Sequence, residues 1–255
     1  MSPAFAPALE LREVSKQFGR TEIIRDISLQ IPCGQRHAII GPNGAGKSTL
    51  FNLISGRFEV TAGTLLLNGT DITRRKPFEI NRLGLSRSFQ ITNLFHRLSV
   101  FENLRCSVLW SLGHRYSFWK NLNKLTDAEE RAELILEQVG LKRRRDIAAG
   151  LLTYAEQRAL EIGITIAGGA DVILLDEPTA GMSRAESKRA VEMIRAVTQG
   201  KTLVMVEHDM SVVFDLADRI SVLVYGQVIA TGTPAEIRSN DAVREAYLGQ
   251  PAAAA

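Results

Sequence analysis

Short apolar runs alternate with longer amphipathic stretches through the second half of the chain. The apolar runs have the length and composition of buried strands, and they are Asp171–Asp176, Thr202–Glu207 and Ile220–Tyr225. The amphipathic stretch Arg184–Val197 and the segment Met210–Ala217 separate them. Because strands alternate with helices, the pattern predicts a parallel sheet with right-handed crossovers.

Two other regions have a different pattern. Residues 9–40 and 58–73 contain short strands with turns, including Thr64–Leu67 followed by the hairpin signal Asn68-Gly69, so they predict a mostly antiparallel β region. From about residue 100 to 165 the pattern becomes helical. There the capping box Thr126-Asp127-Ala128-Glu129 predicts a helix over 128–139 that Gly140 ends. The expected fold is α/β, with a mostly parallel core sheet, an N-terminal antiparallel β subdomain and an inserted α-helical subdomain.

Composition narrows the class of protein. The chain has 255 residues, 45% of them hydrophobic, which suffices for one large domain or a core with a subdomain. The 31 basic and 28 acidic residues nearly balance, and no basic stripe is interleaved with aromatics, so we expect no nucleic-acid partner. Cys33 and Cys106 lack the spacing of a disulfide or zinc framework and are expected to be buried. No apolar run approaches about 18 residues, so any membrane role is expected to be peripheral.

One stretch fits the phosphate-binding P-loop, G-x-x-x-x-G-K-S. It lies between the predicted strand Arg36–Ile40 and the predicted helix Ser48–Ile54, as such a loop requires. Glycines let successive N–H groups point at phosphates, Lys47 adds a full positive charge, and the Ser48 hydroxyl is expected to hold Mg²⁺. The predicted nucleotide-binding residues are Gly41, Pro42, Asn43, Gly44, Ala45, Gly46, Lys47, Ser48 and Thr49.

The apolar run that begins at Asp171 ends in two adjacent carboxylates, Asp176 and Glu177. Ligands of open α/β sheets bind at the carboxyl ends of strands. Asp176 is therefore expected to serve the Mg²⁺ shell, and Glu177 to polarise the attacking water. The alternative is a polar strand end followed by a turn at Pro178.

With these motifs, the chain resembles the ATPase subunits of ABC transporters over residues 9–250. The resemblance implies a single domain with a RecA-like P-loop NTPase core that hydrolyses ATP with Mg²⁺. It implies a core and β subdomain at about 9–89 and 160–237, a helical subdomain at about 90–159 and a helical tail at 238–250.

The resemblance also assigns roles to three further residues. Phe18 matches the aromatic residue that stacks on adenine, and Gln90 matches the glutamine that reaches Mg²⁺ and the attacking water. His208 matches the histidine that donates to the γ-phosphate. Gln90 would thus join Ser48 and Asp176 at the metal. Each of the three has a structural alternative: an aromatic on an edge strand, a surface glutamine and a structural histidine.

The family signature, usually L-S-G-G-Q, is altered in this chain. Leu152–Arg158 occupies its place, ahead of a helix expected to begin near Gln157. Thr153 keeps a hydroxyl, and Tyr154 resembles the tyrosine of some importer subunits. Ala155 replaces a glycine, so its methyl group is expected to obstruct the γ-phosphate or to disfavour a positive φ, and Glu156 adds negative charge. We therefore expect slow turnover or an adjusted geometry.

The resemblance also implies partners. Two ATPase subunits close head to tail, and each ATP lies between one P-loop and the other signature, which acts in trans. Integral membrane permeases are direct partners, and a periplasmic or extracellular solute-binding protein is an indirect one. The implied location is cytoplasmic, peripheral on the inner face of the cell membrane. Ala180–Ser183 matches the segment that joins the two ATP sites, without its usual aspartate.

Finer similarities favour one subfamily. The stretches Gly84–Gln90, Leu98–Leu104 and Asp241–Gly249 resemble the branched-chain amino acid importer subunits, and Gly163 with Ala180–Ser183 resembles the related urea importers. The predicted function is ATP hydrolysis that powers import of such solutes. An ATPase of lipopolysaccharide or lipid export is the alternative. A DNA-repair ATPase would need a coiled-coil insertion, and a small-molecule kinase a mobile lid, neither of which the sequence indicates.

The segment Trp110–Leu125 is rich in aromatic and basic residues. One interpretation is a contact surface for the membrane subunit or for lipid headgroups. The other is an amphipathic loop packed on its own subdomain. The sequence leaves both open.

Overall fold

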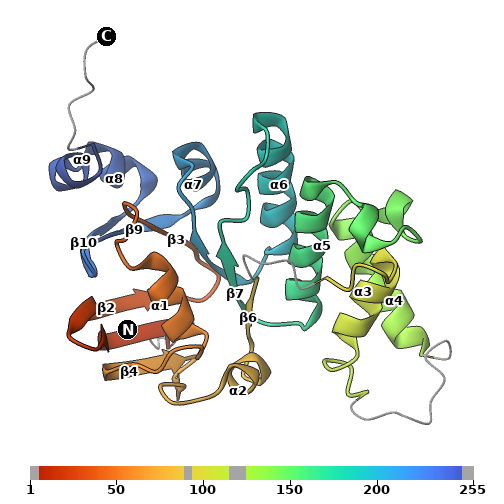
Figure 1. The fold of residues 1–255 in the computed structure, drawn as a ribbon, viewed down its shortest axis with the longest axis horizontal. Coiled ribbons are helices and arrows are strands. Elements are labelled where there is room, and N and C mark those ends of the chain that lie inside the picture. Colours follow the sequence, from red (N-terminus) through yellow and green to blue (C-terminus); the bar gives the residue numbers. More distant parts are fainter. Residues whose placement is uncertain (1–5, 89–93, 115–124, 249–255) are drawn as a thin grey trace, which may run out of the picture.

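The computed structural model describes residues 6–88, 94–114 and 125–248, and two β-sheets form its framework (Figure 1). The larger sheet has the strand order β10-β9-β3-β8-β7-β6, in which β10 alone runs antiparallel to its neighbour. The parallel sheet predicted from the apolar runs is thereby confirmed. Its strands are β3 (Arg36–Ile40), β6 (Leu85–Arg87), β7 (Val172–Asp176), β8 (Thr202–Val206), β9 (Arg219–Val224) and β10 (Gln227–Gly232).

Both faces of this sheet are covered, which explains why its central strands β7 and β8 are fully buried and almost entirely apolar. Alternate residues of one strand belong to different cores: Ile39 and Leu174 pack on one side, Ile40 and Leu175 on the other. The first side packs against α1 (Lys47–Ile54) and the antiparallel sheet, and the second against three other helices. These helices are α5 (Tyr154–Ala167), α6 (Arg184–Val197) and α7 (Met210–Leu216).

The smaller sheet is the predicted antiparallel β region. Its order is β2-β1-β4-β5, with β1 at Leu9–Phe18, β2 at Thr21–Ile31, β4 at Ala62–Leu67 and β5 at Thr70–Asp71. Asn68 and Gly69 both have positive φ, 48° and 76°, as the predicted two-residue hairpin requires. The short helix α2 (Pro77–Arg82) then leads back to the larger sheet.

The inserted helices lie at the end of the molecule opposite the antiparallel sheet (Figure 1). They are α3 (Val100–Val108) and α4 (Thr126–Gln138), followed by 3₁₀ turns at Lys142–Arg144 and Ala149–Leu151. The predicted capping box at Thr126 is wrong, because the buried Leu125 precedes the helix and Thr126 already lies in its first turn. Gly140, at φ 72°, follows the helix as predicted.

The last described elements are α8 (Pro234–Ser239) and α9 (Asp241–Leu248), which lie beside β10. Helix α5 spans the predicted boundary near residue 160, and α8 spans the one near 237. Cys33 and Cys106 are free and exposed, so the expectation that both are buried is wrong. Within the described ranges, no helix has the length and apolar character needed to cross a bilayer.

Candidate nucleotide-binding site

The P-loop connects β3 to α1, and its glycines are required by its geometry. A Cβ at Gly41 would lie 2.0 Å from the carbonyl oxygen of Leu223, so no other residue fits there without moving β9. Gly44 and Gly46 have φ of 80° and 104°, in the left-handed region that favours glycine. The backbone therefore curls as a phosphate-binding loop must.

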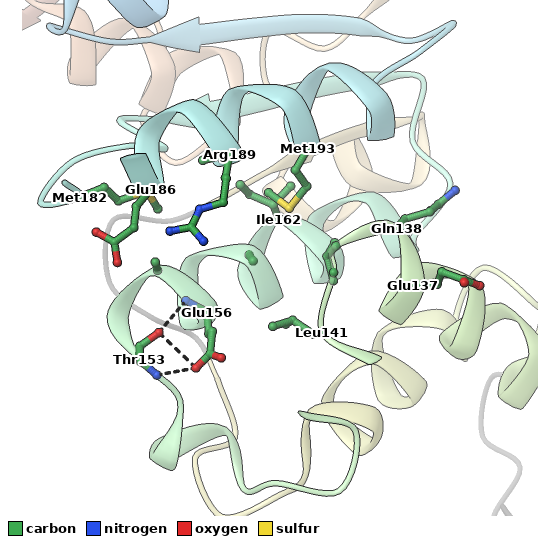
Figure 2. Close-up of a pocket in the computed structure, with 15 residues that line it drawn as sticks. Glu137, Gln138, Leu141, Thr153, Glu156, Ile162, Met182, Glu186, Arg189 and Met193 are labelled. Atoms are coloured by element: carbon green, nitrogen blue, oxygen red, sulfur yellow. Dashed lines mark hydrogen bonds between the residues drawn. The ribbon is translucent and has the colours of Figure 1, made fainter. Parts of the chain in front are cut away.

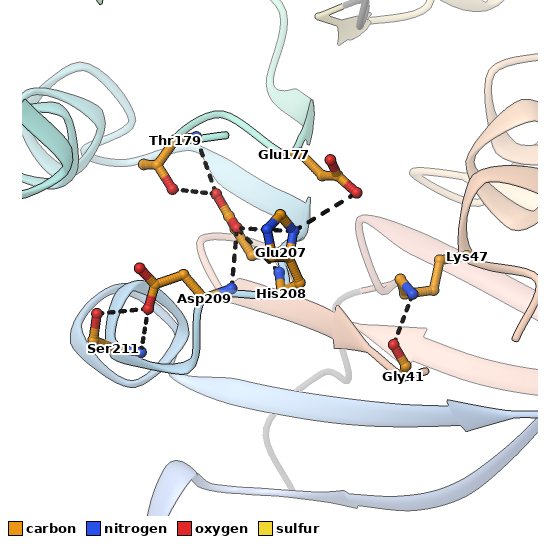
Figure 3. A network of polar contacts seen from close by, with 8 residues as sticks. All are labelled: Gly41, Lys47, Glu177, Thr179, Glu207, His208, Asp209 and Ser211. Carbon is orange, nitrogen blue, oxygen red and sulfur yellow. Dashed lines mark hydrogen bonds and ion pairs between the residues drawn. The ribbon is translucent and has the colours of Figure 1, made fainter. Parts of the chain in front are cut away.

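Lys47, the first residue of α1, folds back over the loop (Figure 3). Its Nζ donates to the carbonyl oxygens of Gly41 at 2.7 Å and Pro42 at 3.0 Å. Burial lowers the pKa of Lys47, while the charges of Glu177 and Asp176 act in the opposite direction. The structure thus brings Lys47 near both predicted carboxylates, as an anion-binding site with an acidic partner requires.

Asp176 ends β7 and is only 2% exposed. Its Oδ2 accepts a hydrogen bond from Nη2 of Arg87 at 2.9 Å. Its Oδ1 is buried and has no hydrogen-bond partner in the part of the chain that the structure describes. A buried carboxylate oxygen without a donor fits a cation ligand, so the residues present are compatible with the predicted Mg²⁺.

Glu177 has the uncommon φ of 48°, which turns its side chain away from the direction of β7. Its Oε1 lies 3.8 Å from Nδ1 of His208 (Figure 3). Its N–H donates to the carbonyl oxygen of Val206. Glu177 and His208, two of the three predicted catalytic residues, are therefore neighbours, although they are separated widely in the sequence. A partly exposed carboxylate beside an imidazole can exchange a proton with a bound water.

Glu207 was not singled out from the sequence, although it is completely buried behind His208. Its Oε1 accepts from the N–H of Thr179 at 3.0 Å and from its hydroxyl at 2.5 Å, and its Oε2 accepts from the N–H groups of His208 and Asp209. Glu207 therefore ties the segment after β7 to the segment after β8 (Figure 3). The signal that was available is a carboxylate at the end of an apolar strand.

Phe18 lies at the end of β1, and 44% of its surface is exposed. Its ring contacts Phe58 edge to face at 5.3 Å between centroids, and Nζ of Lys16 lies 4.8 Å from its centre. In the P-loop, Asn43 and Ser48 are exposed, whereas Ala45 is buried. Gln90 and residues 115–124 of the segment Trp110–Leu125 lie outside the described residues.

The altered signature forms the start of α5. Thr153 is the N-cap: its Oγ1 accepts from the N–H of Glu156 at 3.3 Å, and Oε2 of Glu156 accepts from the N–H and hydroxyl of Thr153. The helix begins at Tyr154, earlier than the predicted start near Gln157. Oε1 of Glu156 accepts from Nε of Arg144 at 2.8 Å, so its charge is partly neutralised.

One expectation about Ala155 is wrong. Ala155 lies within α5 and has helical backbone geometry, so a penalty for positive φ does not arise at this position. Its methyl group lines a hollow of about 430 Å³ between α4, α5 and α6, which also includes Thr153 and Met182 (Figure 2). Of the two effects expected of Ala155, only obstruction of the γ-phosphate by its methyl group stays a prediction.

Tyr154 connects the signature to the segment Ala180–Ser183. Its hydroxyl accepts from Nε of Arg158 at 3.1 Å, and its ring is so close to Gly181 that an added Cβ there would lie 3.2 Å away. The start of α5 and the turn after β7 are therefore in contact. Movement of one is expected to move the other.

Comparison with known proteins gives the family. The model of the ABC transporter family matches residues 24–180, and that of the branched-chain amino acid ATP-binding cassette transporters matches residues 227–253. The chain belongs to the ABC transporter family. As an ATP-binding domain of that family it binds nucleotide and is an ATPase.

Individual ABC proteins resemble the chain over almost its whole length. The high-affinity branched-chain amino acid transport ATP-binding protein LivG of Escherichia coli is 34% identical over 96% of this chain and 98% of its own. BraF of Pseudomonas aeruginosa, which carries the same description, is 34% identical with equal coverage. A nucleotide-free ATP-binding cassette of an ABC transporter superposes with a TM-score of 0.82 at 29% identity, over 95% of this chain and 99% of its own.

Proposed function

We propose that this ABC ATPase powers the import of branched-chain amino acids or related solutes. The observation that carries the proposal is the similarity to LivG and BraF over the full length, together with the match of residues 227–253 to the branched-chain amino acid transporter model. The alternative, an ATPase of lipopolysaccharide or lipid export, is not favoured by these similarities.

The proposed chemistry uses the P-loop and the ends of the parallel strands. The N–H groups of the loop and Lys47 bind the triphosphate, and the ring of Phe18 stacks on adenine. Ser48, Asp176 and Gln90 would hold Mg²⁺, which when bound neutralises charge on the phosphate oxygens. Support comes from the orphaned Oδ1 of Asp176 and from the exposure of the Ser48 side chain.

Two residues are proposed to act on the attacking water and the γ-phosphate. Glu177 accepts the proton of the water, and His208 donates to the γ-phosphate oxygens. The distance of 3.8 Å between them favours one shared site. Glu207 is unsuited to the role of base, because its carboxylate is buried and already occupied by backbone and hydroxyl donors.

The site is proposed to be completed by a second ATPase subunit. Its signature, the equivalents of Thr153, Tyr154, Ala155 and Glu156, would act in trans and present a helix N-terminus to the γ-phosphate. Membrane permeases and, indirectly, a solute-binding protein are the further partners. The chain would work on the cytoplasmic face of the membrane, where closure on ATP and release after hydrolysis drive the permeases.

The proposed substrate class is tested in proteoliposomes. The chain is purified with the permeases, second ATPase and solute-binding protein proposed as its partners, and uptake of radiolabelled leucine, isoleucine and valine is measured with ATP inside. We expect that unlabelled valine inhibits this uptake by competition and that unlabelled lysine leaves it unchanged. Lys47→Ala provides the control that lacks ATP-driven uptake. ATP hydrolysis without uptake of any branched-chain amino acid would contradict the proposed cargo.

A further inference from the structure

Arg87 lies at the end of β6, next to the strand that carries Asp176, and its side chain is only 7% exposed. Its Nη2 donates to Oδ2 of Asp176 at 2.9 Å, and its Nη1 donates to Oδ1 of Asn52 and Oγ of Ser55, each at 2.8 Å. Asn52 belongs to α1, and Ser55 directly follows it. One side chain therefore joins the end of the P-loop helix to the carboxylate at the end of β7.

The two oxygens of the Asp176 carboxylate are in different situations. Oδ2 accepts from Arg87, whereas Oδ1 is buried and accepts from no group within residues 6–88, 94–114 and 125–248. Leaving such an oxygen buried without a donor is unfavourable unless a ligand satisfies it. The neighbouring Arg87 thus uses one oxygen of the carboxylate and leaves the other available.

Arg87 is well suited to fix the orientation of a carboxylate. Its guanidinium is planar and keeps its charge, so it has a fixed set of donor directions. Its own position is set by the acceptors on Asn52 and Ser55 and by the ring of Phe51, whose centre is 5.6 Å from Cζ. Groups that hydrogen-bond to a metal-ligating carboxylate orient it and raise metal affinity.

We propose that Arg87 is a positioning residue of the magnesium site. It holds Oδ2 of Asp176 so that Oδ1 is presented to the Mg²⁺ of the bound nucleotide, and it links this carboxylate to α1. The metal ligand and the P-loop helix are thereby kept in one rigid unit. The inference rests on the proposed function, since it takes Asp176 to serve the Mg²⁺ shell.

The test measures metal binding directly. Mn²⁺ replaces Mg²⁺ as the probe, and its free concentration is followed by electron paramagnetic resonance during titration of the full chain with ADP present. Arg87→Lys keeps the charge but loses the planar donors, so we expect Mn²⁺ affinity to fall about 10- to 100-fold. ADP affinity in EDTA should stay unchanged. Equal Mn²⁺ affinity in the folded variant would overturn the proposal.

A matched control is available in the same sheet. Arg36 makes a similar pair with Asp218, in which Nη2 lies 2.9 Å from Oδ1. This pair lies where β3 and β9 begin, at the edge of the sheet opposite to that of Asp176. Arg36→Lys should leave Mn²⁺ affinity as in the parent. A fall equal to that of Arg87→Lys would reduce the role of Arg87 to general support of the sheet and would also overturn the proposal.

A second variant covers the case in which Arg87→Lys does not fold. The double substitution Asn52→Ala with Ser55→Ala removes the anchors of Arg87 but keeps its pair with Asp176. We expect a several-fold loss of Mn²⁺ affinity with an unchanged circular dichroism spectrum, and unchanged affinity would contradict the proposal. If the parent chain itself binds no Mn²⁺ with ADP, the proposed function fails rather than the role of Arg87.

Discussion

The P-loop region and the start of α5 are held in place by different means. Around the P-loop, buried groups fix the geometry: Asp176 pairs with Arg87, Glu207 binds four donors, and Gly41 packs directly against β9. At the start of α5, Thr153 and Glu156 form a capping box, and Arg144 adds an ion pair that is partly exposed.

We infer that this difference accounts for the altered signature that the resemblance indicates. In a buried polar network, a change in one member leaves its partner unpaired, so few geometries and few substitutions are tolerated. A helix cap and a surface ion pair are each worth only about 1 kcal/mol or less. The P-loop region keeps the expected residues, whereas the signature tolerates Ala155 and Glu156.

The largest effect is expected for Gly41→Ala. The new Cβ would lie 2.0 Å from the carbonyl oxygen of Leu223, so β9 has to shift. We expect a loss of about 3 kcal/mol of unfolding free energy in urea and loss of nucleotide binding. Gly44→Ala is the matched control, because its φ of 80° brings strain but no heavy atom lies within 4 Å of the new Cβ. Equal losses for the two variants would show that the close packing of Gly41 against β9 does not fix the loop.

The pH dependence of stability tests the buried environment of His37, which lies in β3, the strand that leads into the P-loop. Burial, followed by the charge of Arg219, lowers the pKa of His37 to about 4, and its Nε2 is hydrogen-bonded to Ser221 at 2.8 Å. The unfolded chain takes up the proton more readily. The free energy of unfolding is therefore unaffected by His37 above about pH 6.5, and it falls by up to about 3 kcal/mol as the pH approaches 4.

The comparison variant for this prediction is His37→Gln. Unfolding free energies at pH 7 and pH 4.5 are measured by urea denaturation for both chains. The variant should lose less stability between the two pH values than the parent. The same pH dependence in both chains would show that His37 does not carry the effect.

Glu207→Gln should have an intermediate effect. The amide has only one acceptor oxygen, so it cannot serve Thr179 on one side and the N–H groups of His208 and Asp209 on the other. We expect a loss of about 2 kcal/mol in stability and slower ATP turnover, with His208 displaced. Glu192→Gln, at an exposed position of α6, is the control and should change neither quantity.

The smallest effect on stability is expected at the signature. Ala155→Gly lies in the first turn of α5, so it should cost less than about 1 kcal/mol. If the methyl group obstructs the γ-phosphate as proposed, turnover in the assembled transporter should rise. Ala159→Gly, on the same helix, is the control for helix propensity. Unchanged turnover in Ala155→Gly would contradict the expected obstruction of the γ-phosphate by the methyl group.

Local patterns in the sequence predicted most of the fold. The central strands β7 and β8 are almost entirely apolar because both faces of the sheet are covered, and Asn68-Gly69 marks a turn that needs positive φ at both residues. The capping box at Thr126 failed because burial of Leu125 shifted the start of α4. The positive φ expected at Ala155 failed because the helix begins before it.

Contacts between distant segments could not be predicted in the same way. Arg87 reaches Asp176 only because β6 and β7 are neighbours, with Arg87 paired to Leu174. Glu207 meets Thr179 because β8 and β7 end at one edge of the sheet. Nothing in the local sequence of either residue gives its partner, so both required the structure.

Glu177 is proposed to act as the base at an ATP site built from the P-loop and Asp176. The most direct measurement compares phosphate release and nucleotide affinity in the assembled transporter for the parent and Glu177→Gln. We predict a fall in turnover of at least about 100-fold with ATP affinity retained, since general-base catalysis contributes that much. Turnover equal to that of the parent would contradict the claim.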